Sequence, residues 1–302
     1  MEKIRVAIVG WGNVGRFCRH AIECSLDMEC VGIVRRPQSL GLNQDELAGY
    51  KVVSDIDELD KKVDVALLCV PSREAPLKAE EYLSKGICTV DSFDIHSSIL
   101  EIREQLNVVA QKNKTVCVFA SGWDPGTDSA IRALMKIICP NGATTTTFGG
   151  QRGGRSMGHT AAVKAIPGVK NAVSLTLPNG AGKHKRQVYI ELEEGADFQK
   201  VADAIRQDAY FSSDPTDVVA VDNVAQYDTF NHGGEICRIM EDISQKYTLE
   251  GNNPKMTANV LVACVRAACR AKERKQFGAY TFIERPLIDY LPGEVEEQMR
   301  GY

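Results

Sequence analysis

The feature that most constrains the fold is the run of residues 4–15, in which an apolar segment leads directly into glycines spaced as G-x-G-x-x-G. A helical pattern follows, with apolar residues on one face as far as Ile22. A strand, a tight turn and a helix in this order are typical of a dinucleotide-binding unit. There the first glycine permits the turn, the second lets backbone approach a pyrophosphate, and the third permits close packing, with the helix N-terminus directed at the phosphates. The run therefore predicts cofactor binding by Gly10, Gly12, Asn13, Val14 and Gly15.

The cofactor is predicted from Arg35 and Arg36. They follow a second apolar strand at residues 30–34, about twenty residues after the glycines, where such units place their ribose-binding residue. An acid at this position selects a free 2′-hydroxyl, whereas guanidinium groups can grip a 2′-phosphate and stack on adenine. The pair therefore favours NADP over NAD. The alternative is a solvated surface pair.

Length and charge narrow the class of protein. A chain of 302 residues, 44% hydrophobic and 25% charged, can form two globular domains. A net charge of −4 provides no field that would attract nucleic acid or an anionic membrane. The ten cysteines form no C-x-x-C pair and are expected as small core residues in a reducing compartment, and no metal site is predicted. Since no leader and no apolar run of about eighteen residues is found, a cytoplasmic protein is expected.

Alternation of strands and helices continues to residue 138. Strands are expected at 51–54, 63–70, 88–91 and 116–120, and helices at 73–85, 97–112 and 126–138. With the first two strands, this predicts an α/β, Rossmann-like doubly wound sheet of six parallel strands. Loops at the carboxyl ends of such strands face the cofactor, so contacts are predicted from Cys69, Val70, Pro71, Ser72 and Asp91, although Asp91 is expected to have mainly a structural role.

The pattern changes after Pro140. Amphipathic strands are expected at 172–177, 186–191, 218–221 and 234–239, with a helix at 197–207, which suggests a mostly antiparallel sheet with one exposed face. A final helix at 257–272 is expected to pack on the nucleotide domain. The predicted domains are therefore residues 1–148 for NADP binding, a smaller α+β domain at 149–253 for substrate binding and dimerisation, and 254–302 returning to the first domain.

Acidic residues lie in two loops that follow successive strands, at 91–96 and 121–128. Both loops should open where the nicotinamide ring must lie. Asp94 and Asp124 could hold a substrate α-ammonium, orient its Cα hydrogen and stabilise the iminium left by hydride loss, whereas turn formation is the alternative. Asp128 is better explained as an acid in the first turn of a helix.

The second domain offers candidates for a substrate carboxylate. They are Thr176, the basic run 183–186 with Arg186 at its end, His232 and Asn253. Arginine supplies a planar guanidinium, threonine and asparagine supply neutral hydrogen-bond donors, and histidine supplies a donor whose pKa can be tuned. A solvated strand end and a turn are the ordinary alternatives for the basic run and for His232.

Several motifs together resemble the meso-diaminopimelate dehydrogenase family. The motifs span nearly the whole chain in order: G-W-G-N-V-G-R at 10–16, V-D-S-F-D-I-H at 90–96, G-W-D-P-G-T-D at 122–128, S-M-G-H at 156–159, H-K-R at 184–186 and N-P at 253–254. The resemblance implies an NADP-dependent, reversible oxidative deamination of meso-2,6-diaminopimelate at its D-centre, which gives L-2-amino-6-oxopimelate and ammonia on the route to lysine and cell-wall precursors. It also implies a homo-oligomer, most simply a dimer.

The same resemblance assigns residues to the two ends of the substrate. Asp94, Trp123 and Asp124 would surround the D-centre, with Phe148, Met157 and Gly158 lining the pocket nearby. The distal L-centre would be held by Thr176, Arg186, His232 and Asn253.

Two departures from the family pattern flank this predicted pocket. The 149–154 loop is longer than usual and the 232–253 segment is shorter, so Arg152 or Arg155 could add a carboxylate contact. Two other functions stay open. One is an NADP-dependent dehydrogenase acting on another amino acid or on a sugar, although the sequence lacks the Glu-Lys-Pro motif that is typical of the sugar enzymes. The other is a non-catalytic NADP-sensing protein.

Overall fold

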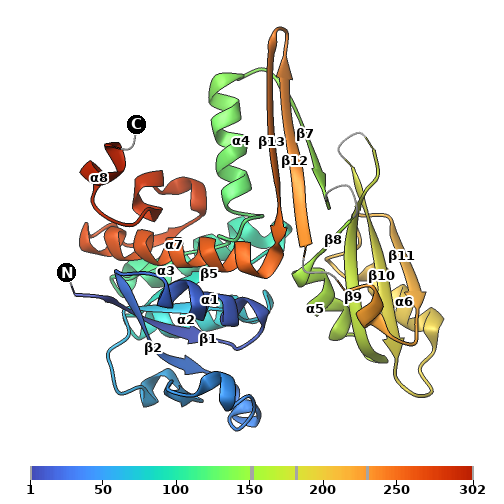
Figure 1. Cartoon of the computed structure of the whole chain (residues 1–302), viewed down its shortest axis with the longest axis horizontal. Helices are drawn as coiled ribbons and strands as arrows, with labels where there is room; N and C mark the ends of the chain where they lie inside the picture. Colours follow the sequence, from blue (N-terminus) through green and yellow to red (C-terminus); the bar gives the residue numbers. More distant parts are fainter. Residues whose placement is uncertain (1, 150–152, 181–182, 229–230, 301–302) are drawn as a thin grey trace. The chain divides into compact units, whose positions relative to one another are not determined.

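The chain forms two compact units in a computed structural model that describes residues 2–149, 153–180, 183–228 and 231–300 (Figure 1). The first unit comprises Met1–Ala130 and Lys255–Tyr302, and the second comprises Ile131–Pro254. The chain thus leaves the first unit inside a helix, earlier than the predicted limit at 148, and returns at Lys255. The functional roles assigned to the domains stay predictions.

The first unit is built on a seven-stranded parallel sheet in the order β14-β6-β5-β4-β1-β2-β3. The order reverses between β1 and β4, as in doubly wound folds, which confirms the predicted fold class. The strands are β1 Ile4–Val9, β2 Met28–Val34, β3 Val52–Val53, β4 Val65–Leu68, β5 Cys88–Asp91, β6 Val116–Val118 and β14 Gly278–Tyr280. The prediction of six strands missed β14, because this short strand pairs with β6, which lies far earlier in the sequence.

Helices cover both faces of this sheet. Val6 and Ile8 of β1 pack with α1 (Asn13–Glu23) and α7 (Asn253–Glu273), whereas Ala7 and Val9 point to the opposite face. There they pack with α2 (Ala75–Ser84) and α3 (Ile99–Lys112). Because successive side chains of one strand are buried on opposite faces of the sheet, the sequences of these strands are continuous apolar runs. A short helix, α8 (Val295–Met299), follows near the end of the chain.

The second unit contains two sheets where one was predicted. One has the order β11-β10-β9-β8 and the other β13-β12-β7. The strands are β7 Ala143–Phe148, β8 Gly154–Arg155, β9 Val169–Pro178, β10 His184–Leu192, β11 Thr216–Ala220, β12 Asn231–Met240 and β13 Ile243–Asn252, and the helices are α5 Met157–Lys164 and α6 Phe198–Gln207.

Most strand pairs of the second unit are antiparallel, as predicted, but β10 and β11 pair in parallel. The long hairpin of β12 and β13 occupies the segment from His232 to Asn253. α4 (Thr127–Ile138) begins in the first unit and continues into the second, where the Gln245 side chain of β13 donates to the Met135 carbonyl at 2.9 Å. Among the described residues, no helix has the length and apolar character needed to cross a membrane.

Candidate active site

The glycine turn between β1 and α1 has the shape that a dinucleotide needs. A Cβ on Gly10, whose φ is 101°, would lie 2.3 Å from the Cys69 carbonyl oxygen, and one on Gly15 would lie 2.4 Å from the Gly10 carbonyl oxygen. Both glycines are therefore required by neighbouring backbone. Gly12 differs, because a Cβ there would meet no atom within 4 Å. It is the N-cap of α1, whose first turn has no acidic residue and no side-chain cap, so its amide groups suit a phosphate.

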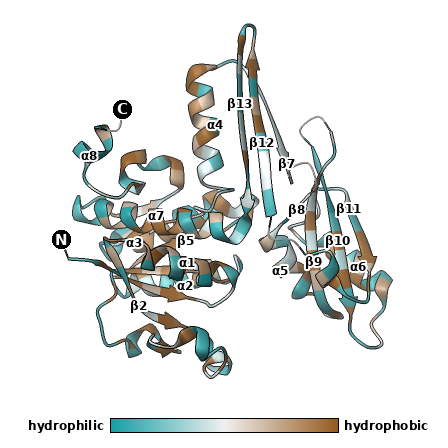
Figure 2. Ribbon diagram, viewed as in Figure 1, coloured by the Kyte–Doolittle hydropathy of each residue, from teal (hydrophilic) through white to brown (hydrophobic). Residues whose placement is uncertain are grey.

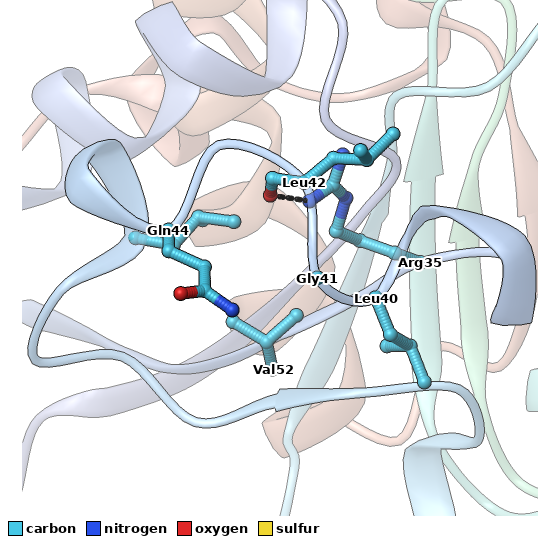
Figure 3. A pocket seen from close by; sticks show the side chains of 7 residues that line it. Arg35, Leu40, Gly41, Leu42, Gln44 and Val52 are labelled. Carbon is cyan, nitrogen blue, oxygen red and sulfur yellow. Dashed lines mark hydrogen bonds between the residues drawn. The ribbon is translucent and has the colours of Figure 1, made fainter.

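Arg35 lies at the end of β2 and lines a pocket of about 250 Å³ (Figure 3). Its Nη1 donates to the Leu42 carbonyl oxygen at 2.6 Å, and its Nη2 donates to Asn43 Oδ1 at 3.4 Å. Arg36, the next residue, is exposed. The pocket wall is otherwise mostly apolar, formed by Leu40, Gly41, Leu42, Gln44, Leu47 and Val52. The structure thus places a guanidinium where the sequence predicted it and ties it to the segment that follows β2.

The loops after β4 and β5 are joined at Asp94. The Ser72 hydroxyl donates to Asp94 Oδ1 at 2.7 Å, and the Asp94 amide donates to Ser72 Oγ at 3.3 Å. Asp94 is half-buried and keeps part of its surface in solvent. Cys69, Val70, Pro71 and Ser72 lie at this edge as predicted, since the Cys69 amide donates to the Val9 carbonyl of β1 at 2.7 Å.

Asp91 joins the loops after β5 and β6. Its side chain is 1% exposed, and Oδ1 accepts from the amides of Phe93 at 2.9 Å and Ala120 at 3.1 Å. Its carbonyl accepts from the Ser121 amide at 2.9 Å, which further restrains Ala120 in its left-handed conformation at φ 51°. Burial raises the pKa of Asp91 to about 6, against the effect of the two amide hydrogen bonds. The predicted cofactor contact stays a prediction, but the geometry gives this carboxyl a structural position.

The loop after β6 carries Trp123 and Asp124. It closes on itself, since a Cβ on Gly126 would lie 1.8 Å from the Gly122 carbonyl oxygen, and the Asp128 amide donates to the Trp123 carbonyl at 2.9 Å. Trp123 is buried, and Asp124 is half-buried. Asp128 lies in the first turn of α4, as expected. The parallel sheet therefore gathers Asp94, Asp124 and the glycine turn at one edge.

In the second unit, Thr176 of β9 and Arg186 of β10 are directly opposite each other. Arg186 Nη1 donates to Thr176 Oγ1, and Nε donates to Asp214 Oδ2 at 2.9 Å. His184 Nε2 lies 3.1 Å from the same Asp214 oxygen. The ring of Phe148 meets that of His184 edge-on, with centroids 5.8 Å apart. Three polar side chains, those of Thr176, Asp214 and His184, thus contact the Arg186 guanidinium, and the Phe148 ring packs against His184.

His232 and Asn253 are connected to the same sheet through β8. A Cβ on Gly154 would lie 2.7 Å from the His232 ring, and Gly154 pairs with Thr176 in the ladder. Burial, followed by the nearby cation of Arg186, lowers the pKa of His232 to about 4, so its imidazole is neutral at pH 7. Asn253 Nδ2 donates to the carbonyl of Arg155 at 2.8 Å. All four residues assigned to the distal centre therefore gather around β8, β9 and β10.

Met157 and Gly158 form the first turn of α5. The N-cap residue Ser156 makes no side-chain cap, because its hydroxyl lies 2.7 Å from His159 Nδ1. Arg155 is buried, and its Nη1 donates to Asp228 at 2.6 Å. The predicted extra role of Arg155 is untested, and Arg152 lies outside the described residues.

Sequence reasoning missed Asp214. The only available signal was an acid before Pro215, which is typical of a turn, and nothing in that run indicated that it would lie against Arg186. The roles of all the residues above as ligands of substrate or cofactor stay predictions.

Comparison with known proteins decides the family. Residues 122–250 match the model of the diaminopimelic acid dehydrogenase C-terminal domain, and residues 1–93 match a CoA-binding domain model. A meso-diaminopimelate D-dehydrogenase from Bacteroides fragilis is 46% identical, with 98% of each chain covered. The chain belongs to the meso-diaminopimelate D-dehydrogenase family.

Solved structures agree with this assignment. Corynebacterium glutamicum diaminopimelate dehydrogenase in complex with diaminopimelate has a TM-score of 0.85 at 30% identity, with 99% of each chain covered. An engineered D-amino acid dehydrogenase bound to NADP+ has a TM-score of 0.86 at 29% identity, again over 99% of each chain. The family predicted from the motifs is thereby confirmed, and so is the predicted enzyme class, an amino acid dehydrogenase.

Proposed function

We propose that this protein catalyses the NADP-dependent, reversible oxidative deamination of meso-2,6-diaminopimelate at its D-centre. The observation that carries the proposal is the edge of the first unit's sheet, where the carboxylates of Asp94 and Asp124 share the carboxyl ends of the strands with the glycine turn. A cationic amine and a dinucleotide are the ligands that suit these two groups.

The residues present fit NADP. The open space at Gly12 and the amides of the first turn of α1 suit a pyrophosphate, and Arg35 and Arg36 suit a 2′-phosphate. When bound, NADP+ supplies the hydride acceptor. Asn13, Val14 and the loop from Cys69 to Ser72 complete the proposed cofactor contacts.

The proposed chemistry at the D-centre rests on charge and position. Asp94 and Asp124 bind the α-ammonium and orient the Cα hydrogen. After the ammonium loses one proton, the hydride leaves with its electron pair, and the two carboxylates stabilise the iminium that forms. Water then adds to the iminium carbon, and the products are a 2-oxo acid, ammonium, the reduced cofactor and one proton. Ser72 fixes the Asp94 carboxylate through the 2.7 Å hydrogen bond. Trp123, Phe148, Met157 and Gly158 are assigned to the surrounding pocket.

The distal L-centre is assigned to the second unit. Arg186 offers a planar fork to the carboxylate, with Thr176, neutral His232 and Asn253 as further hydrogen-bonding groups. Because the two ends are recognised by different residues, the meso isomer should react at its D-end alone.

A homodimer through the second unit is part of the proposal. On α4, which packs beside β12 and β13, Ile137 is 76% exposed and Ile138 61%, and Ile239 of β12 is 56% exposed. Hydrophobic residues run along this part of α4 (Figure 2). Exposed apolar side chains grouped in this way favour burial against a second copy of the chain. Light scattering of the purified protein tests this by measuring its molar mass in solution. A cytoplasmic location is also proposed, since all ten cysteines are free thiols.

The test is an NADPH-formation assay on the purified protein. Meso-diaminopimelate with NADP+ should give NADPH and ammonia, whereas the L,L isomer and NAD+ should be poor. Oxidation of a sugar, or turnover of the L,L isomer as fast as the meso isomer, would contradict the proposal. NADP binding without turnover of any amino acid would point to the sensing alternative.

A further inference from the structure

Asp214 shares the guanidinium of Arg186 with the proposed distal site. Its Oδ2 accepts from Arg186 Nε at 2.9 Å and lies 3.1 Å from His184 Nε2. The backbone reinforces this pairing, because the Arg186 amide donates to the Pro215 carbonyl at 2.8 Å. The side chains of Arg186 and Asp214 are 12% and 16% exposed, so the pair is mostly removed from water. Asp214 is thus fixed beside the fork that is assigned to the substrate carboxylate.

The two carboxylate oxygens of Asp214 differ. Oδ2 is engaged by Arg186 and His184, whereas Oδ1 accepts no hydrogen bond from the part of the chain that the structure describes. A half-engaged carboxylate beside a cation can still accept from a second donor, because each oxygen has two lone pairs. Oδ1 is therefore available to a ligand's cationic group.

Charge balance favours one kind of ligand. Arg186 is positive and Asp214 negative, and burial together with the nearby Arg186 lowers the pKa of His184, which keeps its imidazole neutral. The cluster is therefore close to neutral as a whole. A lone carboxylate would gain from Arg186 but would be repelled by Asp214, whereas a head group with both an ammonium and a carboxylate matches both charges.

We propose that Asp214 is a specificity-determining residue that binds the distal ammonium of the substrate through Oδ1 while Arg186 binds the distal carboxylate. This inference rests on the proposed function. In an amino acid the two charged groups are attached to one carbon, so the residue that binds the ammonium must lie next to the residue that binds the carboxylate. Asp214 is the acid that the hydrogen bonds place there.

The experiment compares substrates that differ only at the distal end. Meso-diaminopimelate carries both distal charges, D-2-aminopimelate lacks the distal ammonium, and D-norleucine lacks both. Wild-type protein should prefer meso-diaminopimelate over D-2-aminopimelate in kcat/KM by about ten- to a hundredfold, the ratio for one charge-assisted hydrogen bond. Asp214→Asn keeps an acceptor for Arg186 but removes the charge, so this preference should collapse, mainly through KM for meso-diaminopimelate. D-norleucine should be unaffected.

Asp217→Asn is the matched control, because Asp217 lies three residues further on, with its side chain 63% exposed and paired with Lys185. It should leave all three substrates unchanged. If Asp214→Asn loses kcat/KM equally on meso-diaminopimelate and D-2-aminopimelate, the inference is wrong and Asp214 only supports Arg186. If the variant keeps the wild-type preference for meso-diaminopimelate without such losses, the inference is also wrong. If Asp214→Asn fails to fold, the wild-type comparison still decides, since equal efficiency on both substrates overturns the inference. Failure of the proposed function is distinct, because wild-type protein would then not oxidise meso-diaminopimelate at all.

Discussion

Replacing Asp91 with asparagine should change how the stability of the first unit depends on pH. The Asp91 carboxyl is 1% exposed, and its Oδ2 accepts no hydrogen bond within the described residues. Burial therefore raises its pKa from 3.8 to about 6, although two backbone amides donate to Oδ1.

The sign and size of the effect follow from linkage. Between about pH 4 and pH 6 the folded protein keeps the Asp91 proton, whereas the unfolded chain has lost it, so stability falls as pH rises through this window. One pH unit corresponds to 1.36 kcal/mol, so the raised pKa amounts to about 3 kcal/mol. Wild type should thus be more stable relative to Asp91→Asn at pH 4 than at pH 7 by about 2.5 kcal/mol, because near pH 4 part of the unfolded chain still carries the proton. The absolute cost of burying the asparagine amide cancels in this comparison.

Urea unfolding at a series of pH values, followed by tryptophan fluorescence, measures the difference. The two tryptophans, Trp11 and Trp123, both lie in the first unit, so the signal reports the unit that holds Asp91. Asp60→Asn is the control, since it removes a carboxyl on a side chain that is 76% exposed and should shift the free energy of unfolding little at any pH. Parallel curves for wild type and Asp91→Asn, or a difference of opposite sign, would refute the reasoning.

The remaining predictions concern the ligands. Replacing Arg35 and Arg36 together with serine should raise KM for NADP+ by the loss of two charge-assisted contacts of about 1.5–3 kcal/mol each, with little change for NAD+; equal weakening toward both cofactors would show that they do not read the 2′-phosphate. Asp124→Asn should greatly lower kcat/KM with NADP+ binding intact by titration, and near-normal turnover would exclude contact with the reacting ammonium. Arg186→Met should weaken meso-diaminopimelate by roughly 2–5 kcal/mol while D-norleucine is tolerated, and an unchanged meso preference in kcat/KM would mean that Arg186 does not bind the distal carboxylate.

Most of the first unit could be predicted because its rules are local. A buried parallel strand is a continuous apolar run, and the glycine spacing marks the turn, so β1, β2, β4 and β5 were found close to their observed limits. The carboxyl ends of consecutive parallel strands meet at one edge, which is why Asp94 and Asp124 could be assigned to one edge from sequence. The role of Asp91 was less accessible, because its bond to Ala120 depends on the conformation of a left-handed alanine.

The second unit was predicted less completely, although one of the strands that were missed has a clear alternation. β13 alternates half-buried and exposed residues from Ile243 to Glu250, as expected for a strand with one solvated face. β8 has only two residues, and it forms because Gly154 fits against His232, a contact that no local pattern encodes. The division into two sheets likewise depends on which strands pair.

The contrast between Asp124 and Asp214 shows why one acid could be assigned to a site and the other could not. Asp124 follows a strand of a parallel sheet, so its place at the carboxyl edge follows from the topology alone. Asp214 stands 28 residues from Arg186 and reaches it only because β11 pairs in parallel with β10, after a crossover that contains α6. The alternation of apolar and polar residues in a strand does not show whether that strand pairs in parallel or antiparallel, since both orientations expose every second residue. The orientation of β11 therefore determines whether the Asp214 carboxylate lies beside the Arg186 guanidinium, and with it the substrate specificity proposed for this pair.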